Sequence, residues 1–355
     1  MLAQFIISPI LSEDAVNREL DNIDSEFMES KNSDVCRLQE FFCHECKTQR
    51  SVGKRHPFGN FSWGNTESLQ VRPKEQGVDI MKELRQFFDQ NYYAQNITLV
   101  VIGAYSLDQI EKEVVKYYSD VPTLPRGEGS EHSNSLAIRR EDAGSWNAKS
   151  YTPIRDFGMP FHNESLGHIC RLVPVRDKHS LYITWQVPPQ WENWRSKPCD
   201  YISHLLGHES QGSLLSALKE KSWVNGSYAG LGSGGYENAS SHALFSLQFT
   251  LSEEGVLHWA DIVFLVYQYI GMLRYYCETG LPAWIYDELR AMGEMAYKYE
   301  DESSPEDTVV AMAERLVPYE VVPPEHILDG YSLFFEFDGE AIKVRSFIFL
   351  YLSKK

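Results

Sequence analysis

The sequence predicts an α+β protein built from two related halves. Amphipathic stripes at helical spacing, such as the one in residues 12–30, predict helices. Short apolar or alternating runs, such as residues 243–250, predict strands. Residues 11–27 can also be aligned with residues 281–296, which suggests that one plan occurs twice. A length of 355 residues suits two domains.

Each predicted element rests on local signals of period and capping. Ser12 is a good N-cap, with Glu13 and Asp14 in the first turn where the helix dipole favours negative charge. Residues 97–103 are a continuous apolar run, which predicts a strand buried on both faces. Residues 36–55 are interpreted as loop-rich, and 344–352 as a β-like run. The predicted helices are 12–30, 78–90, 107–118, 199–208, 212–221, 252–276, 282–299 and 303–316, and the predicted strands are 97–103, 168–175, 181–187 and 243–250.

Composition excludes several classes of function. A net charge of −17 argues against nucleic acid and anionic membranes as partners, and suits a protein that receives basic or mixed peptides. The first residues lack a positively charged region and a small-residue cleavage site, so no signal peptide is predicted. No run reaches the roughly 18 apolar residues of a membrane span. Six cysteines without a disulfide framework predict free thiols in a reducing cytoplasm.

Glu19 and Glu26 are the first candidate site. They are seven residues apart on the predicted first helix, so they lie within about 20° of each other around its axis. Both fall at the flank of the apolar stripe, where a pair of carboxylates is costly unless a cation meets it. A metal ion is one candidate and an arginine or lysine is another. The simpler alternative is a solvated helix edge.

Cys43 and Cys46 form a CxxC step, with Cys36 upstream and His56 downstream. This composition suits a small zinc site, but a second CxxC is absent. Free surface thiols are the alternative interpretation.

Two stretches, ILSEDAVNRELDNIDSEF and HPFGNFSWGNTESL, resemble the pitrilysin (insulinase) family of zinc metallopeptidases. The resemblance is to the branch of insulin-degrading enzyme and nardilysin. It implies two pitrilysin-type (LuxS/metallohydrolase-like) repeats of mixed sheet plus helices, the first truncated at its N-terminus. The implied domains are 1–125, the C-terminal part of a catalytic domain, a linker at 126–150, and 151–355, a second and non-catalytic domain that is incomplete at its C-terminus.

The resemblance also implies roles for the acidic helix. In the family, one helix carries His-x-x-Glu-His and a second helix supplies the third zinc ligand from an Asp-Ser-Glu step. Asp24-Ser25-Glu26 matches that step, so Glu26 is the implied zinc ligand and Glu19 the supporting acid. No His-x-x-Glu-His occurs here, and zinc catalysis needs about three protein ligands. The chain is therefore expected to be inactive alone, and a missing N-terminal segment or a subunit could carry the histidines.

His204 and His208 are the only pair of histidines four residues apart. Aligning the two halves places Glu19 over Glu288 and Glu26 over Met295. The second half thus lacks both a general base and a carboxylate ligand at the matching places, because Gly207 occupies the position of the base. Zinc at these histidines is the less favoured alternative to satisfied or partly exposed side chains.

The block HLLGHESQGSLLSALKEKSWVNGSYAG resembles the part of the family that forms an exosite for a substrate's N-terminus. There, an extended peptide adds to a strand edge while an acidic residue meets its amine. The matching positions here are His204, Gly207, Glu209, Ser227 and Ala229. Ser227 and Ala229 stand where Leu and Gly are usual, and Ala allows a less close approach than Gly.

The favoured hypothesis is a partial zinc metalloendopeptidase that acts on peptides. The rival is a non-catalytic member of the family that binds peptides or serves as a scaffold. A Gly-rich connector in this block is the structural alternative to the exosite.

Overall fold

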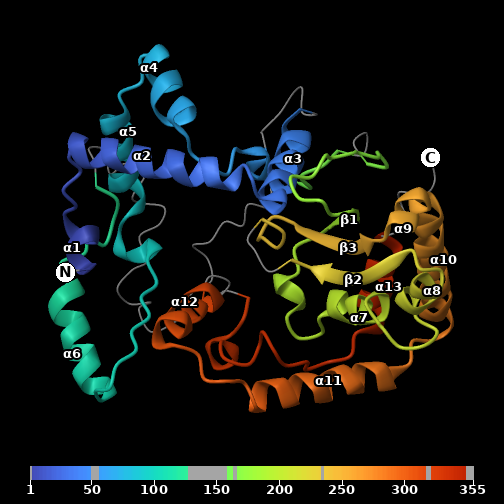
Figure 1. Cartoon of the computed structure of the whole chain (residues 1–355). Helices are drawn as coiled ribbons and strands as arrows, with labels where there is room; N and C mark the ends of the chain where they lie inside the picture. Colours follow the sequence, from blue (N-terminus) through green and yellow to red (C-terminus); the bar gives the residue numbers. More distant parts are fainter. Residues whose placement is uncertain are drawn as a thin grey trace. The chain divides into compact units, whose positions relative to one another are not determined.

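A computed structural model describes residues 2–48, 56–126, 158–162, 166–232, 236–316 and 321–348 (Figure 1). The chain divides into two compact units. Unit 1 comprises Met1–Asn32, Ser62–Thr152 and Glu302–Glu320, and unit 2 comprises Ser33–Phe61, Pro153–Asp301 and Val321–Lys355. The predicted linker at 126–150 lies, apart from Arg126, outside the described residues, and the predicted domain boundaries remain predictions.

The described part of unit 1 is helical. Its α-helices are α1 (Leu2–Ile7), α2 (Glu13–Ser30), α4 (Arg72–Glu75), α5 (Ile80–Asn91), α6 (Leu107–Tyr118) and α12 (Pro305–Leu316), with short helical turns η2 (Glu67–Val71) and η3 (Ala94–Asn96). The predicted cap of α2 is present, because the Ala15 N–H donates to Ser12 Oγ at 3.3 Å. The Arg126 guanidinium donates to the carbonyls of Ile6 and Ile7 at the end of α1, at 3.0 and 3.2 Å.

The predicted strand at 97–103 is wrong. This run is extended but pairs with no strand among the described residues, and Leu99, Val101 and Ile102 are 37%, 45% and 48% exposed. The predicted strand at 168–175 is wrong for the same reason. Its backbone is held by side chains, since the Val175 N–H donates to Asp34 Oδ1 at 2.8 Å. An apolar run specifies a strand only where a partner strand meets it.

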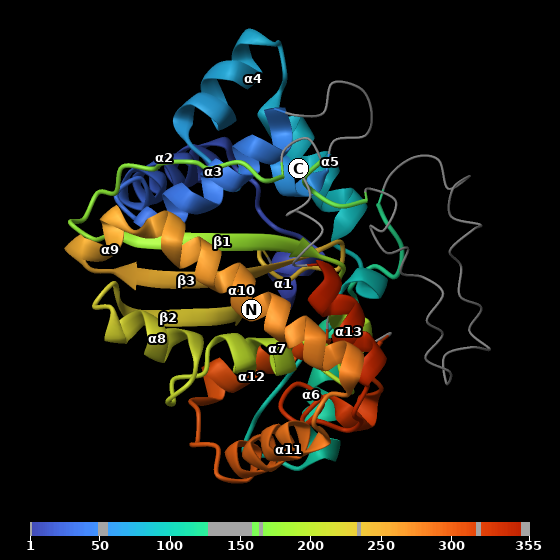
Figure 2. The same ribbon diagram turned by 90° about the vertical axis from the view of Figure 1, so that its right-hand side faces the viewer.

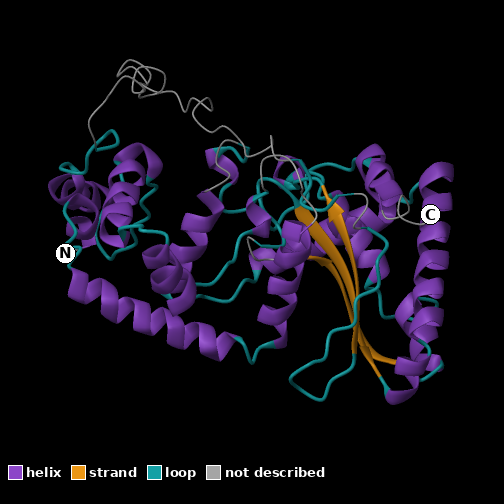
Figure 3. Ribbon diagram, turned by 90° about the horizontal axis from the view of Figure 1, so that it is seen from above, coloured by secondary structure: helices purple, strands orange, loops and turns teal. Residues whose placement is uncertain are grey.

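Unit 2 is built on a three-stranded sheet that we number β1 (Ser180–Val187), β2 (Val224–Leu231) and β3 (Ala243–Leu251). Their order is β1-β3-β2 and both pairings are antiparallel. β1 and β3 match the predicted strands, and β2 was expected only as the strand edge of an exosite. The three strands lie side by side, and helices form most of the remaining ribbon (Figure 3).

One face of the sheet is the core of unit 2. Trp185, Phe245, Leu247 and Phe249 lie on it and are at most 1% exposed. The opposite face is more polar, although the buried Leu244 lies on it, and the Thr184 and Ser246 hydroxyls lie 3.0 Å apart there. The core face is covered by α7 (Pro198–Leu206), α8 (Leu214–Glu220) and α10 (Trp259–Thr279), the last crossing in front of the strands in Figure 2.

The other helices of unit 2 are α3 (Asp34–Thr48), α9 (Glu253–Leu257), α11 (Ala283–Lys298) and α13 (Gly339–Ile348), with short turns η1 (Pro57–Gly59), η8 (Trp191–Asn193) and η9 (Pro324–His326). Three of them correct the predictions. Residues 34–48 are helical where a loop was predicted, and the predicted helix at 252–276 is interrupted at His258. The predicted β-like run is helical up to Ile348, and its remainder lies outside the described residues.

The α+β class is confirmed, with an antiparallel sheet in the described residues. Among the helices that the structure describes, none is long and apolar enough to cross a membrane.

Candidate functional site

The two candidate carboxylates of α2 lie in unit 1 and are exposed. Glu19 Oε2 accepts a hydrogen bond from Asn22 Nδ2 at 3.3 Å. The Asp-Ser-Glu step is fixed through its first member, because the Thr66 N–H donates to Asp24 Oδ1 at 2.8 Å. Glu26 projects from the same helix with its side chain exposed. The step therefore holds a turn against α2 while leaving Glu26 accessible.

The residues described do not assemble a complete zinc site. Within these ranges, no three His, Cys, Asp or Glu side chains come together in a way that could hold a metal ion. A structural or catalytic zinc takes three or four protein ligands, so the described residues do not fit the metal by themselves.

Cys43 and Cys46 lie on α3, and their side chains are buried, at 4% and 2% exposure, in a cluster with Phe58 and Leu244. Cys46 Sγ donates to the Pro160 carbonyl at 3.1 Å. Burial, with smaller contributions from nearby acidic groups, raises the pKa of the Cys43 thiol to about 12. Neither cysteine forms a disulfide with another described residue. They are core residues, so the interpretation of this pair as surface thiols is wrong.

The direction of the backbone in β3 decides which residues of β2 face outward. The Leu251 N–H donates to the His179 carbonyl at 2.9 Å, on the side of β1. The Leu244 N–H donates to the Glu237 carbonyl at 2.7 Å, in the connection from β2. Successive residues of a strand point their backbone groups to opposite neighbours. Odd-numbered residues of β3 therefore bond toward β1, and even-numbered residues toward β2.

This alternation fixes the outer edge of β2. Tyr228 is opposite Gln248, an even-numbered residue of β3, so the backbone of Tyr228 faces β3. Ser227, Ala229 and Leu231 alternate with it and present their N–H and C=O groups to the opposite side. In the described part of the chain β2 has β3 as its sheet neighbour on one side only. Two of the residues singled out in the sequence, Ser227 and Ala229, thus lie on a strand edge.

The other predicted residues lie in the last turn of α7 or just after it, where Gly207 approaches that edge. Gly207 is the C-cap, and its N–H donates to the Ser203 carbonyl at 2.8 Å. A Cβ added at Gly207 would lie 3.0 Å from the Ser203 carbonyl oxygen and 3.4 Å from Ala229 Cβ. Glycine therefore lets the helix end approach the strand. Glu209 follows two residues later and is exposed.

His204 and His208 form an edge-to-face pair with ring centroids 5.3 Å apart. Burial and the second imidazole lower the pKa of His204, and Glu288 opposes that shift. His208 Nδ1 lies 2.9 Å from the Ser210 hydroxyl. The neutral form of His204 is favoured near neutral pH, so this side chain adds little positive charge to the end of α7.

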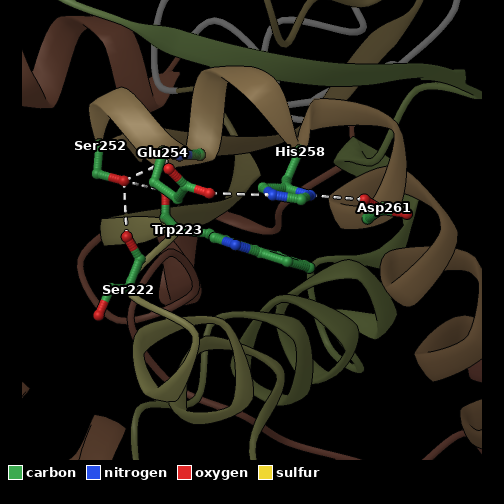
Figure 4. A network of polar contacts seen from close by, with 7 residues as sticks. Ser222, Trp223, Ser252, Glu254, His258 and Asp261 are labelled. Atoms are coloured by element: carbon green, nitrogen blue, oxygen red, sulfur yellow. Dashed lines mark hydrogen bonds and ion pairs between the residues drawn. The ribbon is translucent and has the colours of Figure 1, made fainter.

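The start of β2 is anchored by an ionic and aromatic contact. The ring of His258 stacks on Trp223, with centroids 4.5 Å apart at 13°. His258 Nδ1 lies 2.9 Å from Asp261 Oδ2 and Nε2 lies 3.2 Å from Glu254 Oε1, so the imidazole sits between two carboxylates (Figure 4). Asp261, more than Glu254, raises the pKa of His258. This contact joins the strand to the junction of α9 and α10.

Two residues that sequence reasoning missed also touch the edge. Ser203 on α7 donates its hydroxyl to the Ala229 carbonyl, and Tyr228 donates to the Leu231 carbonyl at 3.0 Å. No sequence signal marks either contact, because both depend on which way β2 faces.

Comparison with known proteins identifies the family of the chain. Residues 79–292, more than half of the chain, match the family described as "Peptidase M16 inactive domain". The chain therefore belongs to that family. Nardilysin of Homo sapiens is 33% identical over 343 residues, which are 96% of this chain and 26% of nardilysin. Insulin-degrading enzyme of Bos taurus is 31% identical over 345 residues, or 96% of this chain and 30% of that enzyme.

Solved structures give the same fold. The crystal structure of pitrilysin superposes with a TM-score of 0.78 at 21% identity, covering 98% of this chain and 33% of that one. A protease from Helicobacter pylori superposes with a TM-score of 0.60 at 14% identity. The predicted resemblance to the pitrilysin family is confirmed. The chain spans less than a third of the length of the nardilysins and insulin-degrading enzymes that it matches.

Proposed function

We propose that this chain binds the N-terminal end of extended peptides along the outer edge of β2. The observation that most supports this proposal is that the backbone N–H and C=O groups of Ser227 and Ala229 point outward, beside the end of α7. A peptide that adds there as a strand pairs with these groups, and its side chains alternate between two faces. Glu209 is exposed two residues after the C-cap Gly207, and it supplies the negative charge for the peptide's amine.

The other two residues of the site shape the approach. Gly207 keeps the space beside Ala229 free of a side chain. His204, with a lowered pKa, adds little positive charge that would repel an ammonium group. The chain's net charge of −17 also favours peptides with a positive end.

The names of the relatives agree with a peptide ligand, since one of them is an insulin-degrading enzyme. Binding without catalysis is the activity that we propose for the chain itself. Its described residues lack a three-ligand metal group.

The binding experiment uses the 355-residue chain and an eight-residue peptide of alternating valine and threonine with two lysines for solubility. The peptide has a free amine and a fluorophore at its C-terminus, and anisotropy measures its binding. We expect acetylation of the amine, or Glu209→Gln, to weaken binding by about two- to fivefold, as for an exposed ion pair. Glu325→Gln, an exposed carboxylate elsewhere in unit 2, is the matched control. Equal affinity for both peptide forms would exclude recognition of the amine.

A second candidate function concerns α2. We propose that Glu26 serves as a zinc ligand, supported by Glu19, when histidines come from outside the described residues. The contact of Asp24 with Thr66 favours it, because it fixes the Asp-Ser-Glu step while Glu26 stays accessible.

The test measures zinc affinity by isothermal titration. The chain is mixed with a separately produced polypeptide that carries a His-x-x-Glu-His helix. We expect Glu26→Gln to weaken zinc binding by the mixture, with Glu13→Gln on the same helix as control. Zinc-dependent cleavage of a short peptide by the pure chain would contradict the expectation that it is inactive alone.

A further inference from the structure

The acceptor groups on the outer edge of β2 are already occupied by hydroxyl groups of the chain itself. The Ala229 carbonyl accepts from Ser203 Oγ of α7. The Leu231 carbonyl, two residues along and on the same side of the strand, accepts from Tyr228 Oη at 3.0 Å. An added antiparallel strand needs these two carbonyls for its own N–H groups.

Both hydroxyls converge on Gly230. A Cβ built on this glycine would lie 2.9 Å from Ser203 Oγ and 3.4 Å from Tyr228 Oη. Its φ of +151° is also in the region that favours glycine. A bare backbone at this position therefore lets one hydroxyl from a helix and one from the strand reach neighbouring carbonyls.

The two contacts differ in how easily they open. Ser203 lies within α7 and its contact with Ala229 is partly buried. Tyr228 is 52% exposed, so its side chain can turn into solvent about its own torsions without moving the backbone. Burial also raises the pKa of Tyr228, so its hydroxyl remains a donor at neutral pH.

We propose that Tyr228 and Ser203 gate the outer edge of β2 and limit how far an added peptide strand extends. This inference rests on the proposed function. A peptide can pair beside Ser227 with both contacts in place, whereas pairing at Leu231 requires Tyr228 to swing away. In the closed state the same contacts protect an exposed strand edge from pairing with other chains.

The test compares Tyr228→Phe, which removes only the hydroxyl, with the wild-type chain in the anisotropy experiment described above. The variant frees the Leu231 carbonyl at no cost in ring packing. A neutral hydrogen bond contributes about 0.5–1.5 kcal/mol, so we expect binding about two- to tenfold tighter. Ser203→Ala is the second variant, with an effect in the same direction. Tyr182→Phe is the control, because Tyr182 is a 39% exposed tyrosine on β1 across the sheet.

Peptide length distinguishes a gate at Leu231 from an effect of Tyr228→Phe on affinity for every peptide. A four-residue version of the peptide should gain less from Tyr228→Phe than the eight-residue version. Unchanged or weaker binding by Tyr228→Phe, with wild-type binding still sensitive to Glu209→Gln, would overturn the gate and leave the proposed function standing. Tighter binding that ignores Glu209→Gln and acetylation would support the gate and reject recognition of the amine. No binding by any variant would reject both.

Discussion

The ammonium group of Lys197 holds together the region from which α7 begins. Lys197 directly precedes α7, and its Nζ donates to the Trp194 carbonyl at 2.6 Å, to the Gly330 carbonyl at 2.9 Å, and to the Leu333 carbonyl. Its backbone is left-handed, with a φ of +42°. A non-glycine residue in this conformation is strained and persists only where its surroundings hold it. The single ammonium group of Lys197 thus provides hydrogen bonds to three carbonyl groups that come from two separate segments of the chain.

Replacing Lys197 by Met keeps the aliphatic stem and removes the donor. Hydrogen bonds from a charged group contribute roughly 1.5–3 kcal/mol each, or about 5–9 kcal/mol for three. Burial lowers the pKa of Lys197 to about 8, which corresponds to a desolvation cost of roughly 3 kcal/mol for the ammonium. The expected loss of unfolding free energy is therefore about 2–6 kcal/mol.

Urea unfolding followed by tryptophan fluorescence measures this loss in the relevant unit. Six of the eight tryptophans, all but Trp63 and Trp146, belong to unit 2. Lys219→Met, at an exposed lysine of α8, is the matched control and should change stability by about 0.5 kcal/mol or less. A Lys197→Met chain as stable as this control would refute the reasoning, since it would mean that water replaces the ammonium without cost.

Two further predictions concern the junction of β2 with α9 and α10. A Cβ at Gly255 would lie 1.9 Å from the Trp223 carbonyl oxygen, so Gly255→Ala should lower Tm by several degrees. Gly271→Ala is the control, because a Cβ there meets open space on α10 and should keep or raise Tm. Equal changes of Tm for the two variants, measured by calorimetry, would contradict this prediction. The pKa of His258 is raised, chiefly by Asp261, so its contribution to stability is complete below pH 6.5 and is lost as pH rises through the raised pKa. The stability difference between wild type and His258→Asn should therefore shrink from pH 5 to pH 8 in urea titrations, and a constant difference would show that the ring acts only by packing on Trp223.

The helices were predictable because their signals are local. Ser12 caps α2 as its side chain and the charges after it indicate, and residues 107–118 form α6 at the predicted bounds. β1 and β3 were predictable because apolar side chains mostly alternate with polar ones in their sequences, SLYITWQV and ALFSLQFTL. In these elements, propensity, period and tertiary packing agree.

The errors arise where the partner of an element decides its structure. Residues 97–103 and 168–175 carry strand-like sequences, but no strand of the described residues pairs with them. α3 was missed for a different reason. Its Cys43-x-x-Cys46 step suggests a metal loop, yet Leu38, Phe42 and Cys46 recur every four residues, and this spacing indicates a helix.

The candidate site shows the same limit. Resemblance pointed to Ser227 and Ala229, but only the pairing of β2 with β3 shows that their backbone groups face outward. The contacts of Ser203 and Tyr228 depend on the packing of α7 beside the strand, and no pattern in the sequence encodes them. Residue types at a site can be inferred from sequence, whereas the state of its hydrogen-bonding groups requires the fold.

We propose β2 as a peptide-binding edge, and such an edge must satisfy two opposing requirements. Its outward backbone groups must be available to a ligand, but permanently free groups would pair with any extended chain. Capping these groups with buried side chains would prevent stray pairing but would also make them unavailable to a ligand. Capping by the exposed Tyr228 exchanges one hydrogen bond for another when a peptide arrives, so the net cost of opening is small. A ligand then gains from several backbone bonds together, which a single stray contact does not provide.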